Sequence, residues 1–174
     1  MSDLAYPIGR FKYEAGNTEK HHQAMDSIAR FGAALEAVCR DINDEQLAWR
    51  YRPDGWTIRQ VVHHCADSHS NGVVRFKLAL TEDTPRIKTY DEKAWSELAD
   101  NQLPIVFSLG ILFGVHARWD ALLKSMTPQD FEKRFFHPEH DREISLAEMT
   151  QLYGWHSNHH LAHIQQALGF KGKY

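Results

Sequence analysis

The sequence predicts an all-α protein, a four-helix bundle whose helices are joined by long connections. Four long segments repeat apolar residues every three or four positions, which is the period of a helix with one buried face. A helix-starting signal, either a capping residue or a proline, stands at the beginning of each segment. The chain has 174 residues, of which 43% are hydrophobic, and this is the size and composition of one globular domain spanning residues 1–174.

The first two predicted helices each carry a single apolar stripe. One begins near Thr18, a plausible N-cap, and its stripe extends to Ile42. The other opens with a capping box, in which Thr57 is the cap and Gln60 the reciprocal partner, and it continues to about Leu80.

The third and fourth predicted helices complete the bundle. The third starts at Pro104, since proline suits the first helical position, and its stripe continues to Met126 with the spacing of bundle packing. The fourth opens with a second capping box, Ser145 with Glu148, and is expected to end at Gly169 as its C-cap.

The connections between these helices are long and irregular. A short helix is expected from Asp44 to Trp49, and another after Thr127. Residues 81–103 are too many for a tight turn, which disfavours a simple up-and-down bundle and is typical of a loop that shapes a site. A small hairpin is expected before the last helix, with its turn at residues 137–140.

Composition excludes several classes of protein. The formal net charge is −3 and no short window is rich in Lys and Arg, so we expect no nucleic-acid partner. The first 20 residues lack the pattern of a secretory signal, and the longest apolar stretch, Leu103 to Val115, is shorter than a membrane span. The two cysteines, Cys39 and Cys65, stand alone without a CxxC motif. These features predict a cytoplasmic protein that does not bind membranes.

Histidine is the one abnormal count, because the chain contains 12 of them. Most fall in two short windows on the second and fourth predicted helices: His63, His64, His69, His156, His159, His160 and His163. Residues four apart on a helix lie on one face about 5–6 Å apart, so His156 and His160 can direct ring nitrogens to one point. Both fall within the apolar stripe and are expected to be buried. Four of the remaining histidines are assigned to surface or loop positions: His21, His22, His137 and His140. His116 lies on the third predicted helix.

The competing interpretation is that these histidines are structural and are satisfied by hydrogen bonds. Each buried imidazole that lacks a partner costs about 1–3 kcal/mol, so two stacked turns of histidine favour a metal site instead. A catalytic site needs a third ligand, which must come from another helix. Helical periodicity does not choose among His63, His64 and His69, and His116 on the third helix is a further candidate.

Two other metal centres of helical proteins are excluded by their motifs. A di-iron site needs paired Glu-x-x-His motifs, and only Glu19 with His22 forms one. A c-type haem needs a CxxCH motif, which is missing. A mononuclear site rich in histidine remains.

Three runs carry a resemblance to a known family: RPDGWTIRQVVHHCADSH (residues 52–69), RFKLAL (75–80) and LYGWHSNHHLAHI (152–164). They resemble the DinB-like superfamily, most of all its YfiT-type branch of metal-dependent hydrolases. The resemblance covers almost the whole chain. It implies a four-helix bundle that holds one divalent ion per subunit, zinc in the first place and nickel in the second. Matched residue by residue, the ligands it implies are His64, His156 and His160, although His63 stays open as the alternative to His64.

The resemblance also implies function classes. The branch is described as metal-dependent hydrolases of small molecules, other members of the superfamily use low-molecular-weight thiols such as bacillithiol for transfer, and cytoplasmic homodimers are common. Three neutral histidines leave the full charge on the ion, so a bound water or thiol is deprotonated near neutral pH. Asp67, His159 and His163 are candidate catalytic residues that orient an imidazole or move a proton. The alternatives are a thiol S-transferase and a non-enzymatic metal-binding module.

Overall fold

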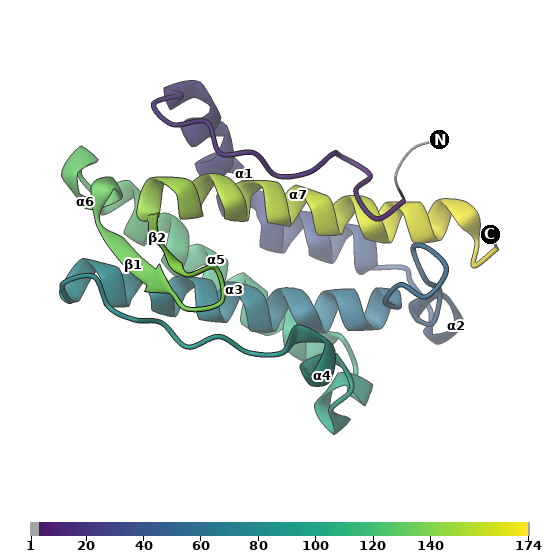
Figure 1. Ribbon diagram of the computed structural model, residues 1–174. Coiled ribbons are helices and arrows are strands. Elements are labelled where there is room, and N and C mark those ends of the chain that lie inside the picture. Colours follow the sequence, from purple (N-terminus) through teal and green to yellow (C-terminus); the bar gives the residue numbers. More distant parts are fainter. Residues whose placement is uncertain (1–3, 174) are drawn as a thin grey trace.

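The computed structural model describes residues 4–173 as four long helices separated by short elements (Figure 1). The long helices are α1 (Thr18–Cys39), α3 (Ile58–Thr81), α5 (Val106–Ser125) and α7 (Leu146–Phe170). The short elements are α2 (Asp44–Leu47), α4 (Glu92–Ser96), the 3-10 helix η1 (Ala99–Gln102), α6 (Pro128–Glu132), β1 (Arg134–His137) and β2 (Arg142–Ser145). The predicted all-α bundle with a hairpin before the last helix is confirmed.

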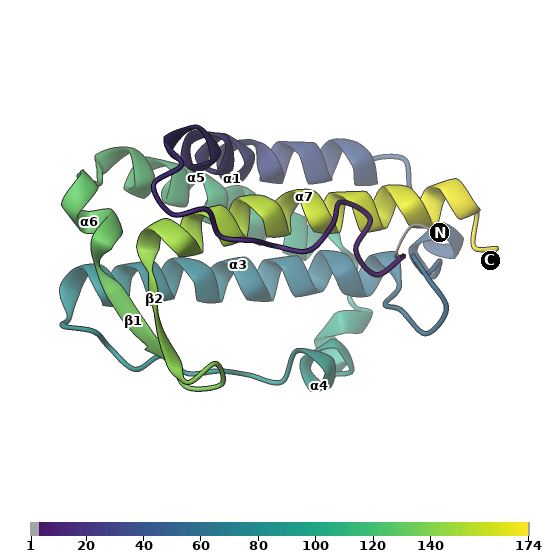
Figure 2. The ribbon, with the colours of Figure 1, turned by 45° about the horizontal axis from the view of Figure 1, so that its top comes forward.

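Each long helix packs mainly against two others. α1 contacts α5 and α7, and α3 contacts the same two, so helices α1 and α3 lie on a diagonal of the bundle. Figures 1 and 2 show α3 and α7 side by side and running in opposite directions. The connections from α1 to α3 and from α5 to α7 cross such a diagonal, which requires more chain than a tight turn and accommodates α2 in one case and α6 with the hairpin in the other. The connection from α3 to α5 joins two neighbours, so its length is not explained by the distance it spans.

Side-chain caps set where three of the four long helices begin, α5 being the exception. Thr57 and Ser145 cap α3 and α7 as predicted, and each side chain accepts a hydrogen bond from the backbone N–H three residues on. The capping box of Thr57 with Gln60 is complete, but the one predicted for Ser145 is only half formed, because the Glu148 carboxylate binds Arg142 instead. In α1 the cap is Asn17, so the helix begins at Thr18 itself. α5 begins at Val106, two residues after the predicted start at Pro104.

The end of α7 differs from the prediction. The helix passes through Gly169 and ends at Phe170, and Lys171 takes the left-handed conformation with φ 52°. Gly172 follows with φ 68°, and a Cβ added there would lie 2.7 Å from the ring of Trp49. A tryptophan far away in the sequence therefore requires the glycine at position 172, and the helix extends one residue past the expected C-cap.

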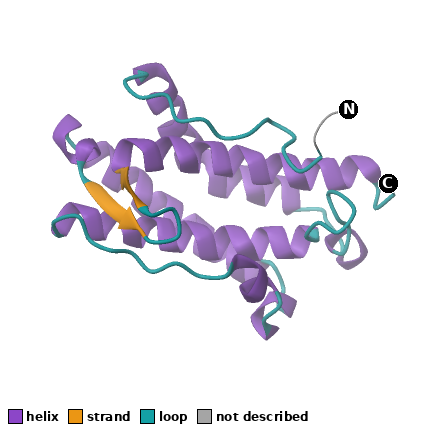
Figure 3. Ribbon diagram, viewed as in Figure 1, coloured by secondary structure: helices purple, strands orange, loops and turns teal. Residues whose placement is uncertain are grey.

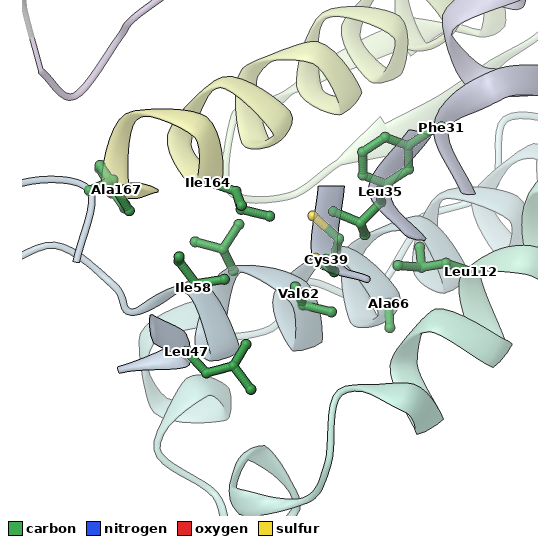
Figure 4. Close-up of a cluster of buried hydrophobic side chains, with 13 residues drawn as sticks. Phe31, Leu35, Cys39, Leu47, Ile58, Val62, Ala66, Leu112, Ile164 and Ala167 are labelled. Carbon is green, nitrogen blue, oxygen red and sulfur yellow. The ribbon is translucent and has the colours of Figure 1, made fainter. Parts of the chain in front are cut away.

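The apolar core is divided into two clusters. The first takes residues from all four long helices, among them Phe31, Val62, Leu112 and Ile164 (Figure 4). The second also draws on all four, among them Ile28, Phe76, Trp119 and Met149. Between the two clusters lie the residues that we call the histidine layer: His69 on α3, His116 on α5, and His156 and His160 on α7.

The hairpin packs on the connection that follows α3. Phe135 pairs with Ile144 in the antiparallel ladder of β1 and β2, drawn orange in Figure 3. The backbone N–H of Ile87 donates to the carbonyl of Phe136 at 3.1 Å, which joins the long connection to β1. This pairing helps to bury His137, whose exposed fraction is 7%, so its predicted surface position is wrong.

α5 is the most apolar of the long helices. Among the described residues it is the one helix whose length and composition would allow it to cross a membrane. One face of α5 packs on α1 and α3. Its outer face is unusually apolar and exposed: Val106, Phe107, Ile111 and Phe113.

Candidate metal centre

Three of the predicted histidines meet at one point between α3 and α7. The Nε2 atom of His156 lies 3.4 Å from Nε2 of His64 and 3.2 Å from Nε2 of His160. All three ligand atoms lie within 4.8 Å of one another. Among the His, Cys, Asp and Glu side chains of the described residues, these three histidines form the group that could hold a metal ion. Two nitrogens about 2.05 Å from one zinc ion at the tetrahedral angle are about 3.3 Å apart, so the donor set fits.

The helices explain why these three residues converge. His156 and His160 are four apart on α7, which places them on the same face, turned toward α3. His64 lies in the second turn of α3, whose start is fixed by the Thr57 capping box. Because α3 and α7 are neighbours in the bundle, the pair on one helix faces the single residue on the other.

The environment keeps the cluster uncharged. Burial lowers the pKa of His64 to about 4 and holds the pKa of His156 and of His160 well below the usual value, with the neighbouring histidines adding to the effect. Neutral imidazoles keep a free lone pair on one ring nitrogen. The cluster is therefore ready to act as a set of neutral nitrogen ligands at physiological pH.

His63 and His69 point elsewhere than their neighbour His64. His63 accepts a hydrogen bond at Nδ1 from the hydroxyl of Ser108 at 2.7 Å, while its Nε2 donates to the carbonyl of Leu103 at 3.1 Å. His69 stands behind the cluster, with Nε2 2.9 Å from Nδ1 of His156. Of the three histidines that periodicity could not separate, the structure brings His64 into the cluster.

The three candidate catalytic residues take different positions. His163 lies with Nδ1 3.4 Å from Nδ1 of His160, so it contacts a candidate ligand directly. His159 stacks on the ring of Trp155, and its buried Nδ1 has no hydrogen-bond partner among the described residues. Asp67 lines a small separate cavity with Asp100 and, among residues 4–173, it makes no hydrogen bond to a histidine. His63 lines the same cavity, so the predicted role of Asp67 in orienting an imidazole stays a prediction.

A cavity of about 770 Å³ opens beside the cluster and includes His156 in its wall. Its other walls come from α3, the long connection before α4, the hairpin and α7, with Arg75, Tyr90 and His137 among them. Sequence reasoning singled out none of these three residues as part of the site. The unusual length of residues 81–103 was the available signal, because that segment supplies one wall of the cavity.

Hydroxyl groups gather on the cavity wall next to His156. The hydroxyl of Tyr153 donates to the carbonyl of Ser68 at 2.8 Å. The hydroxyl oxygen of Ser68 lies 3.3 Å from the hydroxyl oxygen of Tyr153. Burial raises the pKa of Tyr153 and of Tyr90, so both phenols remain protonated at neutral pH: Tyr153 donates to Ser68, and Tyr90 carries a donor at the cavity wall.

Comparisons with known proteins agree with this geometry. Residues 28–164 match the DinB superfamily. The chain is 46% identical over 166 residues to "Putative metal-dependent hydrolase YfiT" of Bacillus subtilis, covering 94% of this chain and 93% of that protein. It is 44% identical over 169 residues to a relative of the same kind from Bacillus pumilus, covering 97% of both.

The solved structure of YfiT from Bacillus subtilis resembles this one closely, with a TM-score of 0.92. The two are 44% identical, and the match covers 97% of this chain and 98% of the other. That protein is described as "a probable metal-dependent hydrolase with an unusual four-helix bundle topology". The bundle, its diagonal connections and the matched sequence lead to one conclusion: this chain belongs to the DinB superfamily and is a relative of YfiT.

Proposed function

We propose that this protein is a hydrolase in which His64, His156 and His160 hold one divalent metal ion that activates water against a small-molecule substrate. The observation that carries the proposal is the spacing of 3.2 and 3.4 Å between Nε2 atoms, next to an accessible cavity. Zinc is the first choice of metal and nickel the second, because a set of neutral imidazoles suits both. The names of the relatives support the reaction class.

The bound ion would supply one kind of chemistry, which is to lower the pKa of a water or thiol ligand so that a nucleophile exists at neutral pH. Three protein ligands are the number found in catalytic zinc sites, whereas structural sites use four. His156 is mostly buried but lies in the cavity wall, so a substrate can approach the cluster from that side.

The protein groups around the cavity would bind and orient the substrate. The hydroxyls of Ser68 and Tyr90 provide donors for a carbonyl oxygen near His156, whereas the hydroxyl proton of Tyr153 is already donated to the carbonyl of Ser68. Arg75 has a buried Nε without a partner among the described residues, and its guanidinium forms no ion pair with them. We assign it the role of holding a polar or anionic end of the substrate.

Thiol transfer is the second candidate function, and the size of the cavity favours it. A volume of about 770 Å³ is ample for a drug-sized ligand, so it has room for a thiol cosubstrate in addition to an electrophile. A protein that only binds metal does not require a substrate-sized cavity beside its ligands. A non-enzymatic metal-binding module is therefore the third candidate function.

We also propose that the protein acts in the cytoplasm as a homodimer. Both cysteines are free and buried, which suits a reducing compartment. The outer face of α5 exposes Phe107 by 59% and Phe113 by 66%, and Gly110 on the same helix has open space around it. A second copy of this face would cover these side chains in a self-complementary contact.

Metal analysis tests the ligand assignment. His160→Ala and His63→Ala are a matched pair, because both histidines are 6% exposed but only His160 lies in the cluster. After zinc loading and gel filtration, we expect about one zinc per chain in the native protein and in His63→Ala, and little in His160→Ala. Equal zinc in all three proteins would refute the assignment.

A substrate screen tests the reaction class. Zinc-loaded protein is offered esters, amides and electrophiles, with and without a low-molecular-weight thiol. Hydrolysis without thiol, lost in His160→Ala, supports the hydrolase. Turnover that requires the thiol favours the transferase, and a metal-loaded protein that turns over neither class would leave the binding module as the correct function.

A further inference from the structure

A chain of three imidazoles leads from the metal cluster into the core and ends on a backbone carbonyl. Nδ1 of His156 lies 2.9 Å from Nε2 of His69, and Nδ1 of His69 lies 2.7 Å from Nε2 of His116. Nδ1 of His116 lies 2.6 Å from the carbonyl oxygen of Ile28. We call this set of contacts the imidazole relay.

The last contact fixes the direction of every hydrogen bond in the imidazole relay. A carbonyl oxygen can only accept, so Nδ1 of His116 carries the proton and its Nε2 is an acceptor. Nδ1 of His69 must then donate to His116, which leaves its Nε2 as the acceptor for the Nδ1–H of His156. We propose that His116 and His69 are positioning residues that hold His156 in the tautomer whose Nε2 lone pair faces the metal site, before any metal binds.

The surroundings of the imidazole relay leave it no other way to pair. His69 is 0% and His116 2% exposed, so neither ring can exchange its partner for water. Phe31 stacks on His69 with ring centroids 4.8 Å apart, and Trp119 meets the same ring edge-on. An aromatic face offers no strong hydrogen-bond acceptor, so a reversed tautomer would leave a buried nitrogen without a partner.

The second ligand on α7 follows the same rule independently. Nε2 of His163 donates to the carbonyl of Ala5 at 3.2 Å, so its Nδ1 is the acceptor for Nδ1–H of His160 at 3.4 Å. Nε2 of His160 therefore also keeps its lone pair, on the side where it faces His156. Both paths end on a backbone carbonyl: His160 is held by His163 directly, and His156 is held by His69 through His116, with the shorter contacts.

The test uses the tautomer of His156, which a merely structural role of His116 would not control. Two-bond ¹H–¹⁵N correlation spectra of metal-free protein distinguish an Nδ1–H ring from an Nε2–H ring. We expect Nδ1–H for His156 in the native protein. In His116→Leu we expect exchange between both tautomers, since Leu neither accepts from His69 nor donates to Ile28. His116→Gln should restore Nδ1–H, because the amide oxygen can accept from His69 while the amide NH₂ group donates to the carbonyl of Ile28.

Zinc affinity provides the second readout. Loss of a hydrogen-bonded partner behind a metal ligand typically weakens metal binding about 10–100-fold, which we expect for His116→Leu, with His116→Gln close to native. His63→Leu is the control, because it removes a buried histidine outside the imidazole relay. An Nε2–H ring in native metal-free protein would overturn the proposal, as would unchanged zinc affinity in a folded His116→Leu.

This inference rests on the proposed function only for the identity of the ligand atoms. The tautomer is measured without metal or substrate, so the native spectrum decides it even if His116→Leu fails to fold. An Nδ1–H ring at His156 in a protein without hydrolytic activity would uphold the imidazole relay and refute the hydrolase.

Discussion

Replacing Asp67 by Asn should stabilise the protein at neutral pH, although the side chain lies close in sequence to a candidate metal ligand. Burial, with repulsion from Asp100 as the second cause, raises the pKa of Asp67 from 3.8 to about 6. The folded state therefore holds a proton on this carboxyl more tightly than the unfolded chain does. Stability is present below the unfolded pKa and is lost as the pH rises through the folded pKa of about 6.

The magnitude follows from the size of the pKa shift. A shift of about two units corresponds to about 3 kcal/mol if solvent did not screen the group. Asp67 is only half-buried, so we reduce the expected effect to about 1–2 kcal/mol. Asn has nearly the same shape but cannot ionise, and no hydrogen bond to the carboxylate is lost with the described residues.

Urea denaturation at pH 4, 6 and 8 measures the effect. The difference in the free energy of unfolding between Asp67→Asn and the native protein should be near zero at pH 4 and about 1–2 kcal/mol in favour of the variant at pH 8. Asp100→Asn removes the repulsion and should lower the pKa of Asp67. Its gain in the free energy of unfolding at pH 8 should be smaller than that of Asp67→Asn, because the burial of Asp67 remains. An Asp67→Asn protein that is less stable at pH 8 would show that the carboxylate is needed there, and that our assignment of its environment is wrong.

Three further predictions concern packing, acid stability and assembly. Gly154→Ala should lower stability by about 1–3 kcal/mol in thermal melts, because its Cβ would lie 2.5 Å from the backbone of Ala24, whereas Gly169→Ala on the same helix meets nothing within 4 Å and should be neutral or better. The metal-free protein should lose stability in urea titrations as the pH falls from about 6.5 toward 4. Burial lowers the pKa of His64 to about 4, so over this range the unfolded chain binds a proton at His64 and the folded protein does not. Constant stability over that range would contradict this reasoning. Phe113→Glu should convert a dimer to a monomer in light scattering, and a native protein that is already monomeric would refute the proposed α5 interface.

The four long helices could be predicted from the sequence because the signals that define them are local. The apolar stripes and the capping residues Thr57 and Ser145 act within a turn or two, so they could be recognised without knowing what lies opposite. The pair His156 and His160 was predictable for the same reason, since one helix sets its spacing.

The remaining features depend on residues far apart in the chain. His63, His64 and His69 occupy different sides of α3, and only the position of α7 selects His64. Gly169 carried a sound local signal for a helix end, but α7 continues to Phe170, and the left-handed residues are Lys171 and Gly172, where a Cβ at position 172 would collide with Trp49. The cavity wall required a segment that local rules describe only as a long loop.

The histidine layer also has a consequence for how the bundle is aligned. Leucine, valine and isoleucine pack against one another in many arrangements, so two apolar helices can slide lengthwise by one turn, about 5.4 Å, at modest cost. Such a slide in α3, α5 or α7 would place an imidazole against an aliphatic side chain and break the contacts between His69, His116 and His156. The residues that prepare the metal site therefore also select one longitudinal register of the helices, and a protein that lost its metal would still keep that register.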